Sequence, residues 1–162
     1  MPNTTRKARN TLIGVAVFQK GIVEGEVLIE QIKNGVKITA TFTKMPPGKH
    51  GFHIHNAGDL RGEGCKGACS HYHVGPPKPH GPAPEKSKDR HTGDLGNIEL
   101  KGDSAHYSYI VKGTSVKELL GRSFIVHADE DDLGLGAYED SKTTGHSGAR
   151  IACAIVGRSK AC

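Results

Sequence analysis

The chain of 162 residues repeats one pattern, in which short apolar or alternating segments are separated by turns. The clearest segment, residues 36–43 (VKITATFT), places every second side chain on an apolar face, and such alternation predicts a half-buried β-strand. Asn34-Gly35 stands just before it and predicts a tight hairpin, because both turn positions need positive φ. Seven further segments predict strands, at residues 11–18, 26–32, 52–55, 95–100, 105–111, 123–127 and 150–156.

Composition supports an all-β fold. Glycine (22) and proline (8) are frequent, and only 35% of the residues are hydrophobic, which suits short strands joined by turns better than a helical bundle. One short segment, residues 115–120 (SVKELL), predicts a single helical turn. Two stretches, 56–93 and 128–149, show no periodicity, and structureless loops of this length are usually functional.

The formal net charge of +5 does not indicate a nucleic-acid-binding protein. Arg6, Lys7 and Arg9 contribute three of these charges in residues 1–10, which we expect to form a flexible basic tail. The remaining chain is nearly neutral and lacks a basic stripe interleaved with aromatic residues. No apolar run approaches the ~20 residues of a membrane span, and residues 1–11 do not resemble a secretory leader. We therefore expect a cytoplasmic protein.

The ten histidines are the most informative residues of the chain. His53 and His55 stand two apart on a predicted strand, where both imidazoles point to the same face. That spacing alone would also fit two exposed residues of an edge strand. The first long loop adds His71, His80 and His91, followed by Asp94, and a later strand ends in His127. Because histidines and a carboxylate form closed zinc sites, this set predicts a metal centre.

Five motifs resemble the copper/zinc superoxide dismutase family, in the family's order and near its spacing. They lie at residues 50–55 (HGFHIH), 91–97 (HTGDLGN), 121–122 with 126–127, 131–134 (DDLG) and 148–153 (GARIAC). The resemblance covers about residues 12–157. It implies an eight-stranded antiparallel Greek-key β-barrel with immunoglobulin-like sandwich architecture, which we assign to residues 11–158, with a short C-terminal tail at 159–162.

The resemblance also implies the ligands of two metal ions. The copper ligands would be His53, His55, His71 and His127, and the zinc ligands His71, His80, His91 and Asp94, so that His71 is shared by both metals. Imidazole nitrogen suits both copper and zinc, and an all-nitrogen tetragonal site suits Cu(II). The stretch between His71 and His91 is longer than in typical family members and contains five prolines.

Four further residues take roles from the same resemblance. Asp131 would join a copper-side histidine to a zinc-side histidine, since metal sites generally need such a supporting carboxylate. Arg150 would guide the anion to copper, and Cys65 and Cys153 would form a disulfide. Cys69 and Cys162 match no cysteine of the family, so we expect free thiols there. A Cys65/Cys69 metal or redox pair is the alternative for this loop.

The implied activity is the conversion of two superoxide radicals and two protons into O2 and H2O2, by cycling of copper between Cu(II) and Cu(I), with catalytic roles for His71 and Arg150. A homodimer and loading by a copper chaperone are the implied partnerships, although Ala57 and Arg158 replace residues that commonly support the dimer. The family's steering lysines are also displaced: Asp129, Glu130 and Thr143 stand near their places, with Lys142 adjacent.

Two other functions remain open at the level of sequence. A copper-delivery module on the same fold would show eroded copper ligands and a CxxC motif, neither of which this chain has. A nucleic-acid-binding β-barrel would need an aromatic stacking platform, and only 5% of the residues are aromatic. The other histidines have simpler interpretations: we expect a packed structural role for His50 and solvent exposure for His73, His106 and His146.

Overall fold

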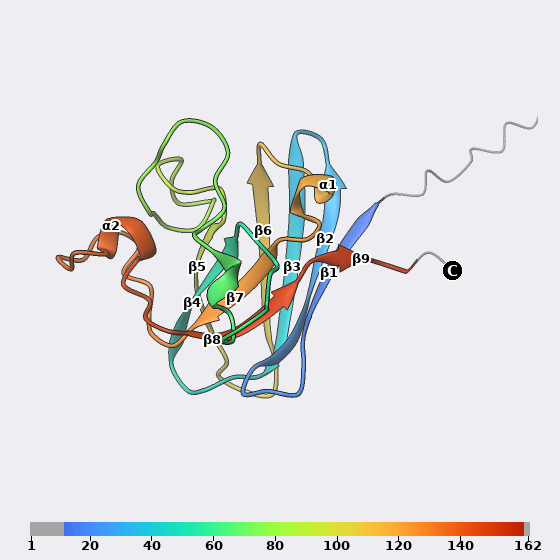
Figure 1. Cartoon of the computed structure of the whole chain (residues 1–162), viewed down its shortest axis with the longest axis horizontal. Helices are drawn as coiled ribbons and strands as arrows, with labels where there is room; N and C mark the ends of the chain where they lie inside the picture. Colours follow the sequence, from blue (N-terminus) through green and yellow to red (C-terminus); the bar gives the residue numbers. More distant parts are fainter. Residues whose placement is uncertain (1–11, 161–162) are drawn as a thin grey trace, which may run out of the picture.

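The computed structural model describes residues 12–160 and contains two antiparallel β-sheets packed face to face (Figure 1). The first sheet has the order β6-β3-β2-β1-β9. Its strands are β1 (Ile13–Phe18), β2 (Glu24–Ile32), β3 (Gly35–Lys44), β6 (Ala105–Lys112) and β9 (Gly157–Arg158). The second sheet has the order β5-β4-β7-β8. Its strands are β4 (Lys49–His55), β5 (Asp94–Glu99), β7 (Ser123–His127) and β8 (Arg150–Ile155).

The strand order confirms the predicted all-β sandwich. β3 pairs with β6, and β4 pairs with β7, so the neighbours in each sheet include strands far apart in the sequence. This happens because the chain passes to the second sheet between β3 and β4 and returns between β5 and β6. Long returning connections of this kind characterise Greek-key sandwiches. The hydrogen-bonded ladders of residues 12–160 form two separate sheets, and none closes them into a barrel.

The last predicted strand, residues 150–156, forms β8, and the described residues contain one further strand, β9, that the sequence did not predict. Val156 donates its N–H to the carbonyl of Arg122 and accepts the N–H of Gly121, both at 2.9 Å. The chain leaves the second sheet at this point, and Gly157 and Arg158 pair with β1. Two residues are too few to show an alternating pattern, so this strand left no signal in the sequence.

Strand β4 connects the core to the functional side of the sandwich. Phe52 and Ile54 belong to the apolar core between the sheets, and Phe52 lies 5.5 Å, between ring centroids, from both Phe42 and Phe124. His53 and His55 alternate with them and therefore point to the opposite face. That face is also buried, because the two long loops cover it.

The two long loops lie together on one side of the sandwich (Figure 1). His80 in the first loop donates its backbone N–H to the carbonyl of Lys142 in the second, at 2.8 Å. The first loop contains the 3-10 turn η1 (Lys66–Ala68), and the second contains the short helix α2 (Ser141–Thr144). The sequence of α2 is polar throughout and shows no apolar period, so the helix was not predicted.

The one helical turn that the sequence predicted is α1 (Val116–Leu119). It begins at Ser115, whose side-chain oxygen accepts the N–H of Glu118 at 3.2 Å, an N-terminal cap that offsets an unpaired donor of the helix. Within residues 12–160 no helix is long and apolar enough to cross a membrane. The predicted basic tail at residues 1–10 and Cys162 lie outside the described residues.

Candidate metal centre

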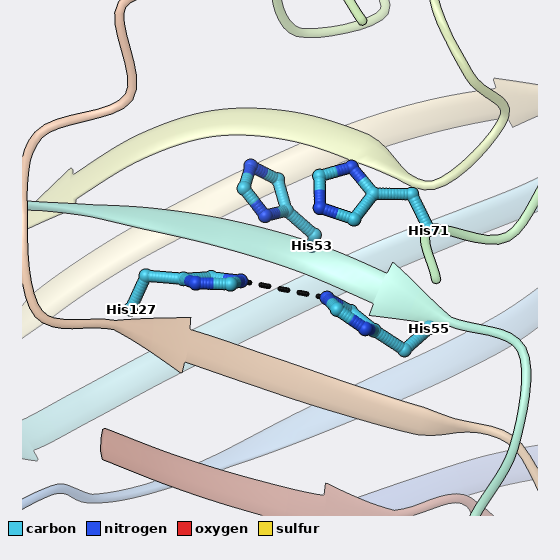
Figure 2. A group of neighbouring side chains, drawn as sticks. All are labelled: His53, His55, His71 and His127. Carbon is cyan, nitrogen blue, oxygen red and sulfur yellow. Dashed lines mark hydrogen bonds between the residues drawn. The ribbon is translucent and has the colours of Figure 1, made fainter. Parts of the chain in front are cut away.

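Four buried histidines converge on the outer face of the second sheet (Figure 2). His53 and His55 come from β4, His127 ends β7, and His71 comes from the first long loop. An isolated β-bridge between His71 and His55 holds the loop residue against the strand. One ring nitrogen from each histidine lies within 4.8 Å of the others, and the Nε2 atoms of His55 and His127 are 3.4 Å apart. We call these four residues the first cluster.

Hydrogen bonds to surrounding groups decide which ring nitrogen of each histidine faces the cluster. His55 donates its Nδ1–H to the carbonyl of Cys69 at 2.8 Å, and His127 donates its Nδ1–H to the carbonyl of Gly148 at 3.1 Å. Both Nε2 atoms are thereby left for the cluster. The remaining two nitrogens, Nδ1 of His53 and Nε2 of His71, are buried and have no hydrogen-bond partner. Since buried polar atoms are rarely left unpaired, these two fit a bound cation.

The second cluster contains His71, His80, His91 and Asp94. Asp94 begins β5, and its Oδ1 lies 2.8 Å from Nδ1 of His71 and 3.1 Å from Nδ1 of His80. Its Oδ2 lies 3.2 Å from Nδ1 of His91. Three imidazoles and one carboxylate match the ligand set of a closed tetrahedral zinc site. His71 belongs to both clusters, since its Nδ1 faces Asp94 and its Nε2 faces the first cluster.

A second carboxylate, Asp131, links the two clusters through hydrogen bonds to one histidine of each. Its Oδ2 accepts the Nε2–H of His53 at 2.7 Å, and its Oδ1 accepts the Nε2–H of His80 at 2.8 Å. Asn97 fixes Asp131 through two hydrogen bonds between its side-chain amide and the backbone of Asp131, at 2.7 and 2.8 Å. Gly145 packs against the hydrogen bond between Asp131 and His80. Its φ is +69°, and a Cβ at this position would clash with Asp131 Oδ1 and His80 Nε2.

The electrostatics keep the first cluster neutral. Burial is the main cause that lowers the pKa of His53 well below its usual range and that of His127 to about 4. In the second cluster, burial also lowers the pKa of His80, but the hydrogen bonds of His80 to Asp131 and Asp94 outweigh burial and raise this pKa to about 9. The imidazoles of the first cluster are therefore neutral, and a neutral imidazole presents the lone pair that binds a metal.

Arg150 lies at the mouth of the first cluster. Its Nη1 donates to the carbonyls of Cys65 and Lys66 at 3.0 and 3.1 Å, and its Nη2 donates to the carbonyl of Cys69 at 2.6 Å. These bonds hold the guanidinium beside a surface pocket whose lining includes His55, His71, His127, Asp140 and Arg150. The first cluster is therefore open to a small solute, and a fixed positive charge lies at its opening.

A disulfide between Cys65 and Cys153 ties the first long loop to β8. The sulfurs pack against Ala68 and Ile125, which are both fully buried. Cys69 is exposed and, among the described cysteines, forms no disulfide. The alternative Cys65/Cys69 pair is therefore not formed in this structure. The carbonyl of Cys65 also accepts a hydrogen bond from Arg150, so the segment around Cys65 holds both the disulfide and the guanidinium.

The remaining histidines occupy distinct surroundings. His50 is buried and bonded at both ring nitrogens, to the carbonyls of His127 (2.8 Å) and Pro46 (3.0 Å). His106 is exposed near Thr41, whereas His73 bonds the carbonyl of Pro76 at 2.7 Å. His146 is half-exposed and paired with Asp140 at 2.6 Å. None of the three belongs to either cluster.

Apart from Asp131, which the family resemblance supplied, the sequence did not single out the residues that orient the ligands. Asn97 was visible only as the last residue of the motif at 91–97, with no role attached to it. The carbonyls of Cys69 and Gly148 hold two of the histidines, yet every residue has a carbonyl, so no side-chain pattern could have identified them. Their positions depend on the path of the two loops.

Comparison with known proteins agrees with this geometry. Residues 23–156 match the family model described as copper/zinc superoxide dismutase (SODC). The chain is 42% identical over 151 residues to a superoxide dismutase [Cu-Zn] of Paramecium bursaria Chlorella virus 1, covering 90% of this chain and 78% of that protein. It is 44% identical over 136 residues to an extracellular superoxide dismutase [Cu-Zn] of Haemonchus contortus, covering 80% and 72%.

Among solved structures, the crystal structure of the clock protein EA4 is similar, with a TM-score of 0.81 and 30% sequence identity over 97% of this chain and 99% of that chain. The family model covers far more than half of the chain, and both relatives exceed 40% identity over most of their own length. The chain therefore belongs to the copper/zinc superoxide dismutase family.

Proposed function

We propose that the first cluster holds copper, through His53, His55, His71 and His127, and that the second holds zinc, through His71, His80, His91 and Asp94. The observation that carries this assignment is the pair of buried, unpartnered nitrogens, His53 Nδ1 and His71 Nε2. Donor chemistry supports it as well. Four imidazole nitrogens suit Cu(II), and three nitrogens with one carboxylate oxygen suit zinc.

The reaction of this family consumes two superoxide anions and two protons and yields O2 and H2O2. Copper supplies the one-electron chemistry by alternating between Cu(II) and Cu(I), and zinc supplies a fixed positive charge without redox change. In our proposal Arg150 attracts and orients the anion in the pocket beside the first cluster. Nε2 of His71 would be a copper ligand, and when this nitrogen is not bound to copper it would hold the proton that the peroxide product takes up. Asp131 keeps the rings of His53 and His80 in place.

Metal reconstitution tests the function directly. The metal-free protein is loaded with copper and zinc, with zinc alone, or with neither, and superoxide consumption is followed by pulse radiolysis. We expect turnover only in the form that contains copper, with one copper and one zinc bound per chain. Stoichiometric binding of both metals without turnover would instead favour the copper-delivery alternative, and absence of metal binding would refute both.

We further propose a homodimer. Leu60 and Ile155 are exposed apolar side chains, and the loop before Leu60 approaches β8 so closely that a Cβ on Gly58 would lie 3.0 Å from Ile155 Cγ2. A shared apolar patch at this place supports association with a second copy. Sedimentation velocity measures the mass, and Ile155→Lys should shift it toward the monomer. An unchanged mass would remove this patch from the interface.

A cytoplasmic location and loading by a copper chaperone also remain our proposals. One relative is named as an extracellular enzyme, so membership of the family does not by itself decide the compartment. Fractionation of the cells that express the chain would decide its location. Copper content after expression with and without a chaperone would decide how copper is loaded.

The assignment of residues 11–158 to one catalytic domain would be tested by assaying that segment alone.

A further inference from the structure

Two segments of the chain supply three of the proposed zinc ligands. Residues 71–76, which we call the first arm, begin with His71, and residues 91–94, the second arm, begin with His91 and end with Asp94. The carboxylate of Asp94 contacts both imidazoles, so the arms must keep a fixed separation for these ligands to meet one metal ion. The contacts that set this separation therefore bear on how firmly the site holds zinc.

Backbone hydrogen bonds fix only the start of the first arm. Tyr72 donates its N–H to the carbonyl of Ile54 and accepts the N–H of Gly93, both at 2.8 Å. Among residues 12–160, no hydrogen bond between two backbone groups joins residues 73–76 to the second arm. Five of the residues from 76 to 84 are prolines, which have no N–H to donate. Beyond Tyr72 the separation of the arms therefore depends on side chains.

His73 supplies a side-chain link at this place. Its Nδ1 accepts the backbone N–H of Thr92 at 3.2 Å and lies 3.3 Å from the hydroxyl oxygen of the same residue. That hydroxyl oxygen accepts the N–H of Val74 at 3.0 Å. The Nε2–H of His73 donates to the carbonyl of Pro76 at 2.7 Å. One imidazole thus connects the two arms and the beginning of the proline-rich stretch.

The partners of His73 decide how both of its ring nitrogens are used. A carbonyl only accepts, so the ring hydrogen is on Nε2, and a backbone N–H only donates, so Nδ1 presents its lone pair to Thr92. His73 is therefore not free to bind a metal, in agreement with its absence from both clusters. Its ring centroid nevertheless lies 5.8 Å from that of His91, which places it beside the second cluster.

The hydrogen bond from His73 to Pro76 closes a turn. Gly75 lies inside this turn at a φ of +98°, in the left-handed region that glycine adopts without strain. The turn directs the chain into the proline-rich stretch that leads to His80, the third histidine of the second cluster. The bonds of His73 therefore reach the chain close to all three of these histidines.

We propose that His73 is a positioning residue of the zinc site, which holds the two arms at the separation that zinc binding requires. The proposal rests on the proposed function, since that function assigns zinc to the second cluster. The bond from Thr92 to Nδ1 is the decisive contact, because it joins the arm of His71 to the arm of His91. His73 supports the backbone beside a ligand and not the ligand ring itself. We therefore expect its loss to lower zinc affinity about tenfold, the lower end for supporting contacts around a metal.

The test uses variants that each keep one of the two bonds. In His73→Asn the side-chain oxygen takes the place of Nδ1, so the bond from Thr92 is kept and the bond to Pro76 is lost. In His73→Gln the longer amide takes the place of Nε2, with the opposite result. His73→Ala removes both bonds. His106→Ala is the matched control, because His106 is an exposed imidazole of β6 that belongs to neither cluster.

Zinc release is measured from copper-free protein loaded with one equivalent of zinc, by transfer to an excess of a chelator that changes colour when it binds the metal. We expect release to be about tenfold faster from His73→Ala and His73→Gln than from the unchanged protein. Release from His73→Asn and His106→Ala should be nearly unchanged.

A spectroscopic measurement separates positioning from a general loss of stability. Cobalt(II), loaded in place of zinc, has a visible spectrum that depends on the geometry of its ligands. This spectrum should be altered in His73→Ala and His73→Gln and restored in His73→Asn. A merely destabilised protein would bind less cobalt, yet the spectrum of the bound ion would stay the same.

Equal release rates from His73→Asn and His73→Gln would overturn the proposal, and so would a rate from His73→Ala equal to that of the unchanged protein. The first comparison does not use His73→Ala, so the proposal is open to refutation even where that variant fails to fold. Failure of the proposed function is distinguishable. If the unchanged protein bound no zinc, both proposals would be refuted, and if it held both metals without consuming superoxide, the release rates would still decide the role of His73.

Discussion

The carbonyl oxygen of Cys69 accepts a hydrogen bond from Nη2 of Arg150 at 2.6 Å. The same oxygen accepts the Nδ1–H of His55 at 2.8 Å. One backbone atom therefore fixes both the guanidinium at the pocket and a histidine of the first cluster. A shift of Cys69 would move the two together, while the carbonyls of Cys65 and Lys66 hold the guanidinium from the same loop.

This anchoring leads to a prediction for Arg150. Arg150→Glu should lower kcat/KM at least about tenfold at low ionic strength, because it reverses the charge that attracts superoxide. Arg150→Lys should lower it far less, since the charge is kept although the planar fork of hydrogen bonds is lost. Copper content, measured by atomic absorption, should not change in either variant. Full activity of the glutamate variant would exclude Arg150 from the mechanism.

The shared position of His71 predicts an asymmetry between two ligand variants. His71→Ala should weaken the binding of both metals, because the ring belongs to both clusters. His127→Ala should weaken copper binding and leave zinc in place, since His127 contacts only the first cluster. Both metals are quantified after dialysis against a chelator of moderate strength. Retention of full zinc affinity by His71→Ala would mean that His71 serves one metal only.

Asp131 predicts coupling between the clusters through a residue that belongs to neither four-residue set. Asp131→Ala removes the hydrogen-bond partner of the Nε2 atoms of His53 and His80. The affinity for both metals should fall about 10- to 100-fold, the usual effect of removing the partner of a metal-bound histidine. Glu130→Gln is the matched control, because Glu130 is exposed and its ion pair among residues 12–160 is with Lys49. Equal metal affinities in the two variants would contradict the coupling.

The Cys65–Cys153 disulfide should stabilise the fold and the pocket together. It joins residues 88 positions apart, and a closed loop of this size is worth about 4–5 kcal/mol in the chain-entropy model. Cys153→Ser should lower the free energy of unfolding by an amount of this order and also reduce kcat/KM, because the Cys65 carbonyl no longer holds Arg150 firmly. Cys69→Ser, which removes a thiol outside the disulfide, should change neither. Denaturant unfolding and the superoxide assay check both effects.

The opposite pKa shifts of two histidines predict how the stability of the metal-free protein varies with pH. The pKa of His127 falls from its ordinary 6.5 to about 4 in the folded protein, mainly through burial. Its contribution to stability is therefore present above pH 6.5 and is lost as the pH falls toward 4. The pKa of His80 rises to about 9 through Asp131 and Asp94, which outweigh burial. Its contribution is present below pH 6.5 and is lost as the pH rises toward 9.

The free energy of unfolding of the metal-free protein should thus be highest near pH 6.5. Guanidinium unfolding at pH 4.5, 6.5 and 9 measures it. His80→Asn should remove most of the loss on the alkaline side, and His106→Asn, on the far sheet, should leave the profile unchanged. A stability that rises steadily from pH 4.5 to pH 9 would contradict the shift assigned to His80.

Much of the fold could be predicted because apolar and polar residues alternate in the sequence wherever one face of a strand is buried. Residues 36–43 show this, and they became β3 with one residue added at each end. The short strand β9 could not be predicted, since the chain leaves the second sheet at Val156 through hydrogen bonds to Gly121 and Arg122. The helix α2 could not be predicted either, because its polar residues are ordered by the loop around them.

The candidate site could be predicted as a set of residues but not as an arrangement of atoms. The spacing of His53 and His55 indicates a shared face, and the family resemblance supplied the grouping of the rest. Neither indicates that His53 faces its cluster with Nδ1 while His55 and His127 use Nε2. That choice depends on Asp131 and on the carbonyls of Cys69 and Gly148, which come from distant parts of the chain.

The two-sided burial of β4 has a consequence for how this sequence can change over time. Phe52 and Ile54 lie in the core and His53 and His55 in the first cluster, so a shift of one residue in strand pairing would exchange the two sets. Such a shift would place imidazoles in the apolar core and remove two nitrogens from the cluster at once. An insertion or deletion within this strand is therefore eliminated by selection on folding before catalysis is tested, and the spacing of the two histidines is inherited with the core.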